Sequence, residues 1–147
     1  AWGLTRATND IDFVADGAFS RQTIAFAESL GYETIHTSEA FSHHVHPESD
    51  YGRVDLLYIY GTTADRLFDN ATKRVSAREV SAPVLRPEHL AMMKALAMKN
   101  RPHRVLIDSP DVAFLLSLPD FDREQVRDYF ARYGLLELFD AIDRHRS

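Results

Sequence analysis

The segment GRVDLLYIYG, residues 52–61, restricts the fold of this chain more than any other part of the sequence. Both of its faces are apolar: Val54, Leu56 and Tyr58 lie on one, and Leu57 and Ile59 on the other. A strand with this pattern is usually covered on both sides. The segment therefore predicts a buried strand in a sheet that carries helices. Asp55 differs from these apolar residues, because it puts a charge where such a strand has the least room for one.

A second strand is predicted at residues 9–16, NDIDFVAD, where apolar and acidic residues alternate. Asp10 and Asp12 point to the same face of such a strand, with their backbones about 6.5–7 Å apart. Two like charges at this spacing repel each other. A divalent cation between them removes that cost, and Mg²⁺ takes oxygen ligands from one or two carboxylates. The simpler interpretation, a pair of acids on a solvent-facing edge, stays open from this motif alone.

Asp55 bears on this choice because it lies in the other predicted strand. A buried carboxylate is usually paired, neutralised or bound to a metal. If the two strands are neighbours, Asp55 joins Asp10 and Asp12 in a cluster of three acids, which suits two-metal phosphoryl transfer. The alternative is a salt bridge from Asp55 to a nearby arginine such as Arg53 or Arg78.

The rest of the pattern predicts an α+β fold, a mixed sheet with flanking helices followed by a helical part. Strands are expected at 33–38 and within 75–85, a loop or short strand pair at 39–50, and helices at 19–31, 62–74, 87–99, 108–118, 122–134 and 135–145. We expect an α/β core over residues 1–86 and a C-terminal helical part over residues 87–147, packed on that core.

Composition excludes several classes of protein. The chain has 147 residues, no cysteine and a net charge of −5. Disulfides and thiolate metal sites are therefore impossible, and duplex DNA is not an expected partner. No apolar run approaches the roughly 20 residues of a membrane span. We expect a cytoplasmic protein, and, because the sequence begins abruptly at AWG, we expect native residues to be missing upstream.

Two motifs together resemble a known superfamily. The run GLTRATNDIDF followed by GRVDLL is similar to the DNA polymerase beta-like nucleotidyltransferases, and the R-x-T-x-D-I-D-F spelling most resembles the AbiEii-type toxins of phage-defence and toxin–antitoxin loci. The segments LRPEHLAMMKALAM, RPHRVLIDSPDVAFLL and YFARYGLLELFD resemble the same family. The resemblance implies Mg²⁺-dependent transfer of an NMP from an NTP to a hydroxyl of RNA, with tRNA as a candidate, or of protein. It also implies a cognate antitoxin as a partner.

The resemblance also assigns residues at the N-terminal end. It implies that Asp10, Asp12 and Asp55 hold the metal and are catalytic, and that Gly3, Arg6 and Thr8 bind substrate. The superfamily cradles the triphosphate with a Gly-Gly or Gly-Ser element ahead of the arginine, where this sequence has AWG. We expect that element to lie upstream or to be lost, so that residues 1–147 fold but transfer feebly. The alternative function is an inactive remnant that binds a nucleotide or a partner.

Lys94 and two later acids form the remaining candidate set. Residues three and four positions away from Lys94 on its helix are apolar, so the lysine lies on the inward face. It either snorkels to solvent or meets an anion, and the resemblance favours a triphosphate contact. Asp108 and Asp111 in DSPD have a plain interpretation as helix-start residues, with Pro110 beginning the helix. The resemblance instead implies that Asp108 orients or deprotonates the substrate and that Asp111 binds it, with Ile107 replacing the family's usual basic residue.

Two further signals have simple interpretations. His43, His44 and His46 suggest a metal cluster at first sight, but their polar surroundings favour a solvated loop. The basic run KNRPHR, residues 99–104, either contacts a phosphate backbone or is a solvated loop.

Overall fold

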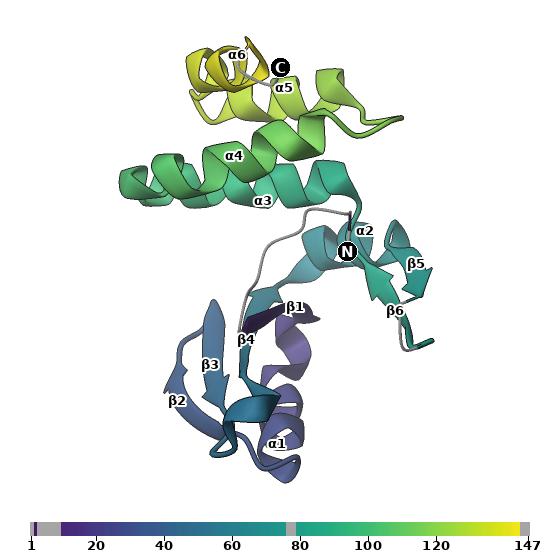
Figure 1. The fold of residues 1–147 in the computed structure, drawn as a ribbon, viewed down its shortest axis with the longest axis vertical. Helices are drawn as coiled ribbons and strands as arrows, with labels where there is room; N and C mark the ends of the chain where they lie inside the picture. Colours follow the sequence, from purple (N-terminus) through teal and green to yellow (C-terminus); the bar gives the residue numbers. More distant parts are fainter. Residues whose placement is uncertain (1, 3–9, 76–78, 145–147) are drawn as a thin grey trace. The chain divides into compact units, whose positions relative to one another are not determined.

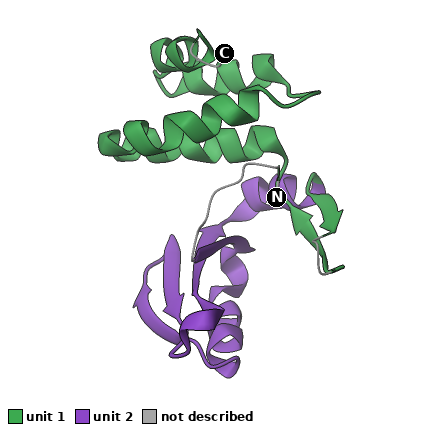
Figure 2. Cartoon of the chain, viewed as in Figure 1, with its two compact units in different colours: residues 1–4, 70–147 green, residues 5–69 purple. Residues whose placement is uncertain are grey.

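The computed structural model describes Trp2 and residues 10–75 and 79–144 (Figure 1). The chain forms two compact units: residues 5–69, and residues 70–147 together with residues 1–4 (Figure 2). The predicted boundary at residue 86 differs from this division. The reason is that β5 (Thr72–Val75) and β6 (Ser81–Val84) pair with each other as a separate antiparallel hairpin and belong to the helical unit.

Unit 2, residues 5–69, is built on a four-stranded mixed sheet with the order β1-β4-β3-β2. The strands are β1 (Asp10–Asp16), β2 (Glu33–Thr37), β3 (Phe41–Val45) and β4 (Arg53–Ile59). β1 runs parallel to β4, whereas β3 is antiparallel to both β4 and β2. The sheet with its flanking helices and the helical C-terminal part confirm the predicted α+β fold class. β4 is an internal strand. β3 is a regular strand in the segment for which the sequence predicted either a loop or a short strand pair.

One face of this sheet is buried. Leu56 and Tyr58 of β4 and Ser42 and His44 of β3 are all buried. Helix α1 (Ser20–Ser29) lies against β1 and β2, and Thr34 donates a hydrogen bond from Oγ1 to Glu28 Oε1 of this helix at 2.7 Å. The buried face of the sheet is therefore the one that α1 covers.

The opposite face of β4 is only partly buried, contrary to the prediction from its apolar pattern. Asp55, Leu57 and Ile59 are half-buried there. Their neighbours explain the difference, because Asp12 and His43 share this face with Asp55. Polar groups of this kind keep contact with water instead of packing under an apolar layer.

The helix after β4 is shorter than its sequence pattern predicts. α2 spans Gly61–Asp69, whereas the expected helix continued to residue 74. Residues 72–75, TKRV, are instead strand β5. Two of these four residues are β-branched, which favours a strand once the β6 partner is available.

Unit 1 is dominated by four helices around one apolar core. They are α3 (Pro87–Asn100), α4 (Val105–Leu116), α5 (Arg123–Arg132) and α6 (Leu136–Arg144), with a short 3₁₀ turn, η3 (Pro102–Arg104), between α3 and α4. The fully buried members of this core include Ala91, Ala95, Val112, Leu116, Val126 and Phe130. Asp122 caps α5 by accepting a hydrogen bond from the Gln125 backbone N–H at 2.9 Å. Among the described residues, no helix is long and apolar enough to cross a membrane.

The start of α4 corrects one prediction. The helix begins at Val105, so neither Asp108 nor Ser109 is its cap, and Pro110 lies inside it instead of at its first position. Pro110 lacks the N–H that would bond the carbonyl of Leu106, one turn earlier. Leu106 is 86% exposed. Water can therefore reach this part of the helix, which lowers the cost of the missing bond.

Candidate functional site

The three candidate metal ligands lie on one face of the unit 2 sheet. Asp12 and Asp55 are direct register partners across the parallel β1–β4 pair, and Asp10 precedes Asp12 by two positions on the same face. Adjacent strands are about 4.8 Å apart. The fold therefore brings Asp12 and Asp55 to neighbouring positions, although 42 residues separate them in the sequence.

The most specific contact at these acids comes from a histidine. His43 of β3 is the register partner of Asp55 on the other side from Asp12. Its Nδ1 lies 2.6 Å from Asp55 Oδ1, and the two side chains are 38% and 21% exposed. Asp55 therefore pairs with His43, whereas the sequence suggested Arg53 or Arg78. Arg78 lies outside the described residues.

A small hollow adjoins the start of the acidic strand. Its volume is about 420 Å³, and its lining is Asp10, Val45, His46, Ser49, Gly52 and Arg53. Asp10 and Arg53 are register partners and begin their strands, and Val45 ends β3. The hollow is therefore at one end of the sheet, with one acid and one base in its wall.

The donor set fits a hard cation in chemistry. Three carboxylates in neighbouring ladder positions supply the oxygen ligands that Mg²⁺ prefers. Within the part of the chain that the structure describes, no three His, Cys, Asp or Glu side chains are gathered closely enough to form a metal cage. Like charges repel at this spacing, and Asp55 is held towards His43. A cation would offset that repulsion and let the carboxylates approach one another.

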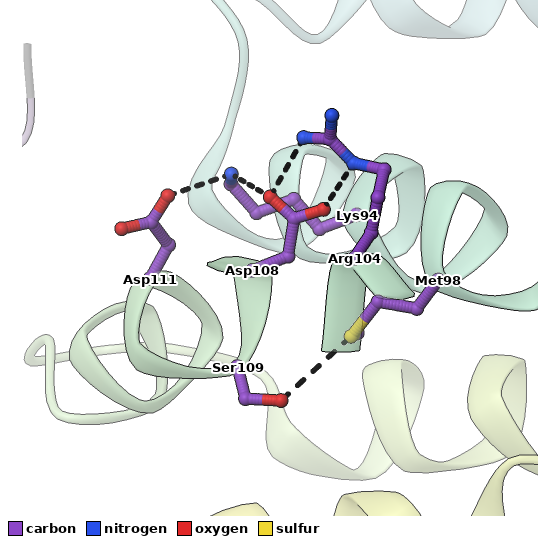
Figure 3. A network of polar contacts seen from close by, with 6 residues as sticks. All are labelled: Lys94, Met98, Arg104, Asp108, Ser109 and Asp111. Carbon is purple, nitrogen blue, oxygen red and sulfur yellow. Dashed lines mark hydrogen bonds and ion pairs between the residues drawn. The ribbon is translucent and has the colours of Figure 1, made fainter. Parts of the chain in front are cut away.

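The other candidate residues form a second cluster, in unit 1. Lys94 of α3 donates hydrogen bonds to Asp108 Oδ1 at 2.9 Å and to Asp111 Oδ2 at 2.7 Å, both on α4 (Figure 3). Arg104 adds two further bonds to Asp108, from Nε at 2.6 Å and from Nη2 at 3.0 Å. Two cations and two anions thus form a network with no net charge.

Burial makes this network energetically important. Asp108 is 1% exposed, and Lys94 is 19% exposed. Burial by itself raises the pKa of Asp108, but the hydrogen bonds and charges of Arg104 and Lys94 outweigh it and hold that pKa below its ordinary value. Asp108 is therefore a carboxylate at neutral pH. Lys94 lies on the inward face of its helix, as predicted, and it meets anions there.

The sequence did not predict the contacts of Arg104 and His43 with the candidate acids. Arg104 belongs to the basic run at residues 99–104. Its position four residues before Asp108 could have indicated the ion pair, because residues i and i+4 on a helix are neighbours. His43 had a weaker signal: it falls two residues after the apolar Phe41, which is a strand spacing. Its contact with Asp55 depends on strand pairing.

The remaining histidines have separate surroundings. His44 is fully buried on the α1 side, where Ser42 Oγ lies 2.8 Å from its Nε2 and Thr34 Oγ1 lies 3.1 Å from its Nδ1. His46 accepts a hydrogen bond from the Glu48 backbone N–H at 3.0 Å and packs against the ring of Tyr51. His43, His44 and His46 therefore do not converge.

The predicted substrate residues Gly3, Arg6 and Thr8 lie outside the described residues. Of the remaining site predictions, the structure places Asp10, Asp12 and Asp55 together on the unit 2 sheet. It places Lys94, Asp108 and Asp111 together in unit 1.

The mixed sheet, its flanking helices and the helical C-terminal part define an α+β protein. No protein-family model matches the chain, and no curated protein matches its sequence. Among solved structures, the chain is similar to the antibiotic-resistance factor ANT(2'')-Ia, with a TM-score of 0.54 and 15% sequence identity over 97% of this chain and 78% of that one. That protein is an aminoglycoside nucleotidyltransferase of the polymerase beta-like fold. The similarity shows the fold, and it does not point to the AbiEii-type toxins in particular.

Proposed function

We propose that this protein is a Mg²⁺-dependent nucleotidyltransferase that moves an NMP from an NTP to a hydroxyl group. The observation that carries the proposal is the common sheet face of Asp10, Asp12 and Asp55, in a chain with a nucleotidyltransferase-like fold. Carboxylates on adjacent strands are suited to hold cations against a triphosphate. Magnesium at these residues would polarise the phosphates and offset the charge that develops on them.

In the proposed reaction, the acceptor oxygen forms a bond to the α-phosphorus of the NTP. The bond from that phosphorus to the bridging oxygen of the β-phosphate breaks, pyrophosphate leaves, and the hydroxyl proton passes to water. The chain's own residues position the reactants. Asp10, Asp12 and Asp55 would act through the cation. The family resemblance separately assigns Lys94 a triphosphate contact.

The acceptor that we propose is RNA, with tRNA as the first candidate and a protein hydroxyl as the second. Support comes from the R-x-T-x-D-I-D-F motif and its resemblance to AbiEii-type toxins. The same resemblance suggests a toxin role with a cognate antitoxin as partner. Gly3, Arg6, Thr8 and Asp111 are proposed substrate contacts, and Asp108 is proposed to orient or deprotonate the substrate.

Incubation with each α-labelled NTP, Mg²⁺ and total cell RNA tests this proposal. We expect label in RNA for the wild-type protein and none after chelation of Mg²⁺ with EDTA. Asp12→Asn keeps the size of the side chain and removes the charge that holds the cation, so its transfer should fall to background. Equal labelling by wild type and Asp12→Asn would contradict the proposal.

A second candidate function is favoured by the bonding of Lys94. Its ammonium already donates to two carboxylates, so a triphosphate either takes its one remaining hydrogen or competes with a carboxylate for it. A binding module that holds a nucleotide or partner without turnover leaves that network intact. Lys94→Arg, which keeps the positive charge, and Lys94→Met separate the two functions. For an enzyme, Lys94→Met should lose transfer while Lys94→Arg retains part of it. For a binding module, neither variant should alter nucleotide affinity.

A further inference from the structure

The half-exposed sheet face that carries the acids also carries a set of aromatic rings on β2 and β3. The ring of His36 stacks on Phe41 with centroids 5.1 Å apart, and Phe41 lies 5.0 Å from the ring of His43. The rings of His36 and His43 are themselves 6.0 Å apart. Packing on two sides restricts the rotation of the His43 ring, and that restriction fixes the direction in which its Nδ1 points.

The direction of the His43–Asp55 hydrogen bond follows from the chemistry of the partners. An ionised carboxylate has no hydrogen to donate, so the proton in the 2.6 Å contact belongs to His43 Nδ1. His43 therefore donates to Oδ1 of Asp55. One oxygen of that carboxylate is occupied, and the other, Oδ2, keeps its lone pairs for a further partner.

The strand order places Asp55 between two different neighbours. On β4 it is flanked by His43 of β3 and by Asp12 of β1, each its direct register partner. A hydrogen bond on the β3 side holds the carboxylate without using the β1 side, where Asp12 lies. Hydrogen bonds of this kind fix the orientation of metal-binding side chains, and their removal costs about 10–100-fold in metal affinity or activity.

We propose that His43 is the positioning residue of the cation site: it holds Oδ1 of Asp55 so that Oδ2 is presented towards Asp12. This inference rests on the proposed function, because it needs Asp55 to be a cation ligand. It assigns to His43 no contact with the cation or with substrate. Phe41 supports this role by packing against the His43 ring.

Mn²⁺ binding, followed by electron paramagnetic resonance of the free ion, tests the inference independently of turnover. Five variants are compared with the wild-type protein, and one of them, Asp55→Asn, removes the charge of the proposed cation ligand. His43→Asn places its amide N–H near the position of Nδ1, so the donor is kept. His43→Gln places the amide near the position of Nε2, and His43→Phe keeps a ring without any donor. His36→Phe is the matched control, because it changes a ring of the same set that packs on Phe41.

We expect His43→Phe and His43→Gln to weaken Mn²⁺ binding by about 10–100-fold, whereas His43→Asn and His36→Phe stay close to wild type. In transfer assays with Mg²⁺, the two weakened variants should regain activity when Mg²⁺ is raised. If His43→Phe does not fold, the comparison of His43→Gln with His43→Asn decides the outcome, with thermal unfolding of each as the check on folding.

Two outcomes overturn the inference, and they differ. Equal Mn²⁺ affinity for His43→Gln, His43→Phe and the His36→Phe control, with binding still abolished by Asp55→Asn, would refute the role of His43 and leave the proposed function standing. Wild-type protein that binds Mn²⁺ no better than Asp55→Asn does would refute the proposed function and the role of His43 with it.

Discussion

Replacement of Asp108 by asparagine should destabilise the helical unit substantially. Asp108 is 1% exposed and accepts three hydrogen bonds, one from Lys94 and two from Arg104. Asparagine keeps one acceptor oxygen and puts an NH₂ group where the second oxygen lies, against donors that need an acceptor. Of the two carboxylates that the partly buried Lys94 ammonium contacts, only that of Asp111 then remains.

The expected cost can be estimated from these contacts. Breaking a buried ion pair costs about 3–5 kcal/mol, and a hydrogen bond to a charged group contributes about 1.5–3 kcal/mol. The side chain of Arg104 is 35% exposed and reaches water, which reduces the penalty for losing its partner. We therefore expect Asp108→Asn to lower the opening free energy of this unit by about 3 kcal/mol. Asp111→Asn loses one charged hydrogen-bond partner and should cost about 1.5 kcal/mol.

Native-state hydrogen exchange is the suitable assay because the chain has two compact units that need not unfold together. The slow amides of α3 and α4 report on the mutated unit, and those of β4 serve as the internal control. The reasoning predicts a loss of protection confined to unit 1. A loss under about 1 kcal/mol in α3 and α4, within the range of a surface substitution, would refute it.

Two further outcomes follow from other contacts. Burial lowers the pKa of His44 below its ordinary value of 6.5, against opposing effects of Glu28 and Asp55. At low pH the unfolded chain therefore takes up a proton that the folded chain does not. The protection of the β4 amides should fall as the pH drops below about 6.5. His44→Asn should flatten that dependence, and an unchanged slope would contradict it. Asp122→Ala removes the α5 cap and should cost about 1 kcal/mol, measured by exchange of the α5 amides; no change in those amides would show that the cap is dispensable.

The sequence predicted the parts of this fold that depend on local pattern. The apolar faces of residues 54–59 indicated the internal strand, and alternation at residues 10–16 indicated the strand that pairs with it. The joint placement of Asp12 and Asp55 was predicted on the condition that the two strands are neighbours, which the sheet order confirms.

What the sequence missed depends on contacts between distant segments. β3 has polar residues at alternate positions, and His44 becomes a buried residue only because Ser42, Thr34 and Tyr58 complete a hydrogen-bonded set around it. The role of His43 likewise needs β3 to lie beside β4. These pairings are set by the whole sheet, and no local pattern in the segment specifies them.

The helix α4 was misjudged for a different reason. The sequence DSPD contains the residues that favour a helix start, and those signals are real in isolation. The structure begins the helix three residues earlier, at Val105, immediately after η3. This helical path brings Arg104 one turn from Asp108, and the resulting bidentate ion pair supports the early start.

The proposal that this protein transfers a nucleotide is tested most directly by comparing two labels on one NTP. With Mg²⁺ and the acceptor RNA, label at the α-phosphate should enter RNA, and label at the γ-phosphate should appear in pyrophosphate. The Asp12→Asn variant should produce neither labelled RNA nor labelled pyrophosphate. Transfer of the γ-label to the acceptor, or incorporation of the α-label that Asp12→Asn and EDTA leave unchanged, would contradict the proposed function.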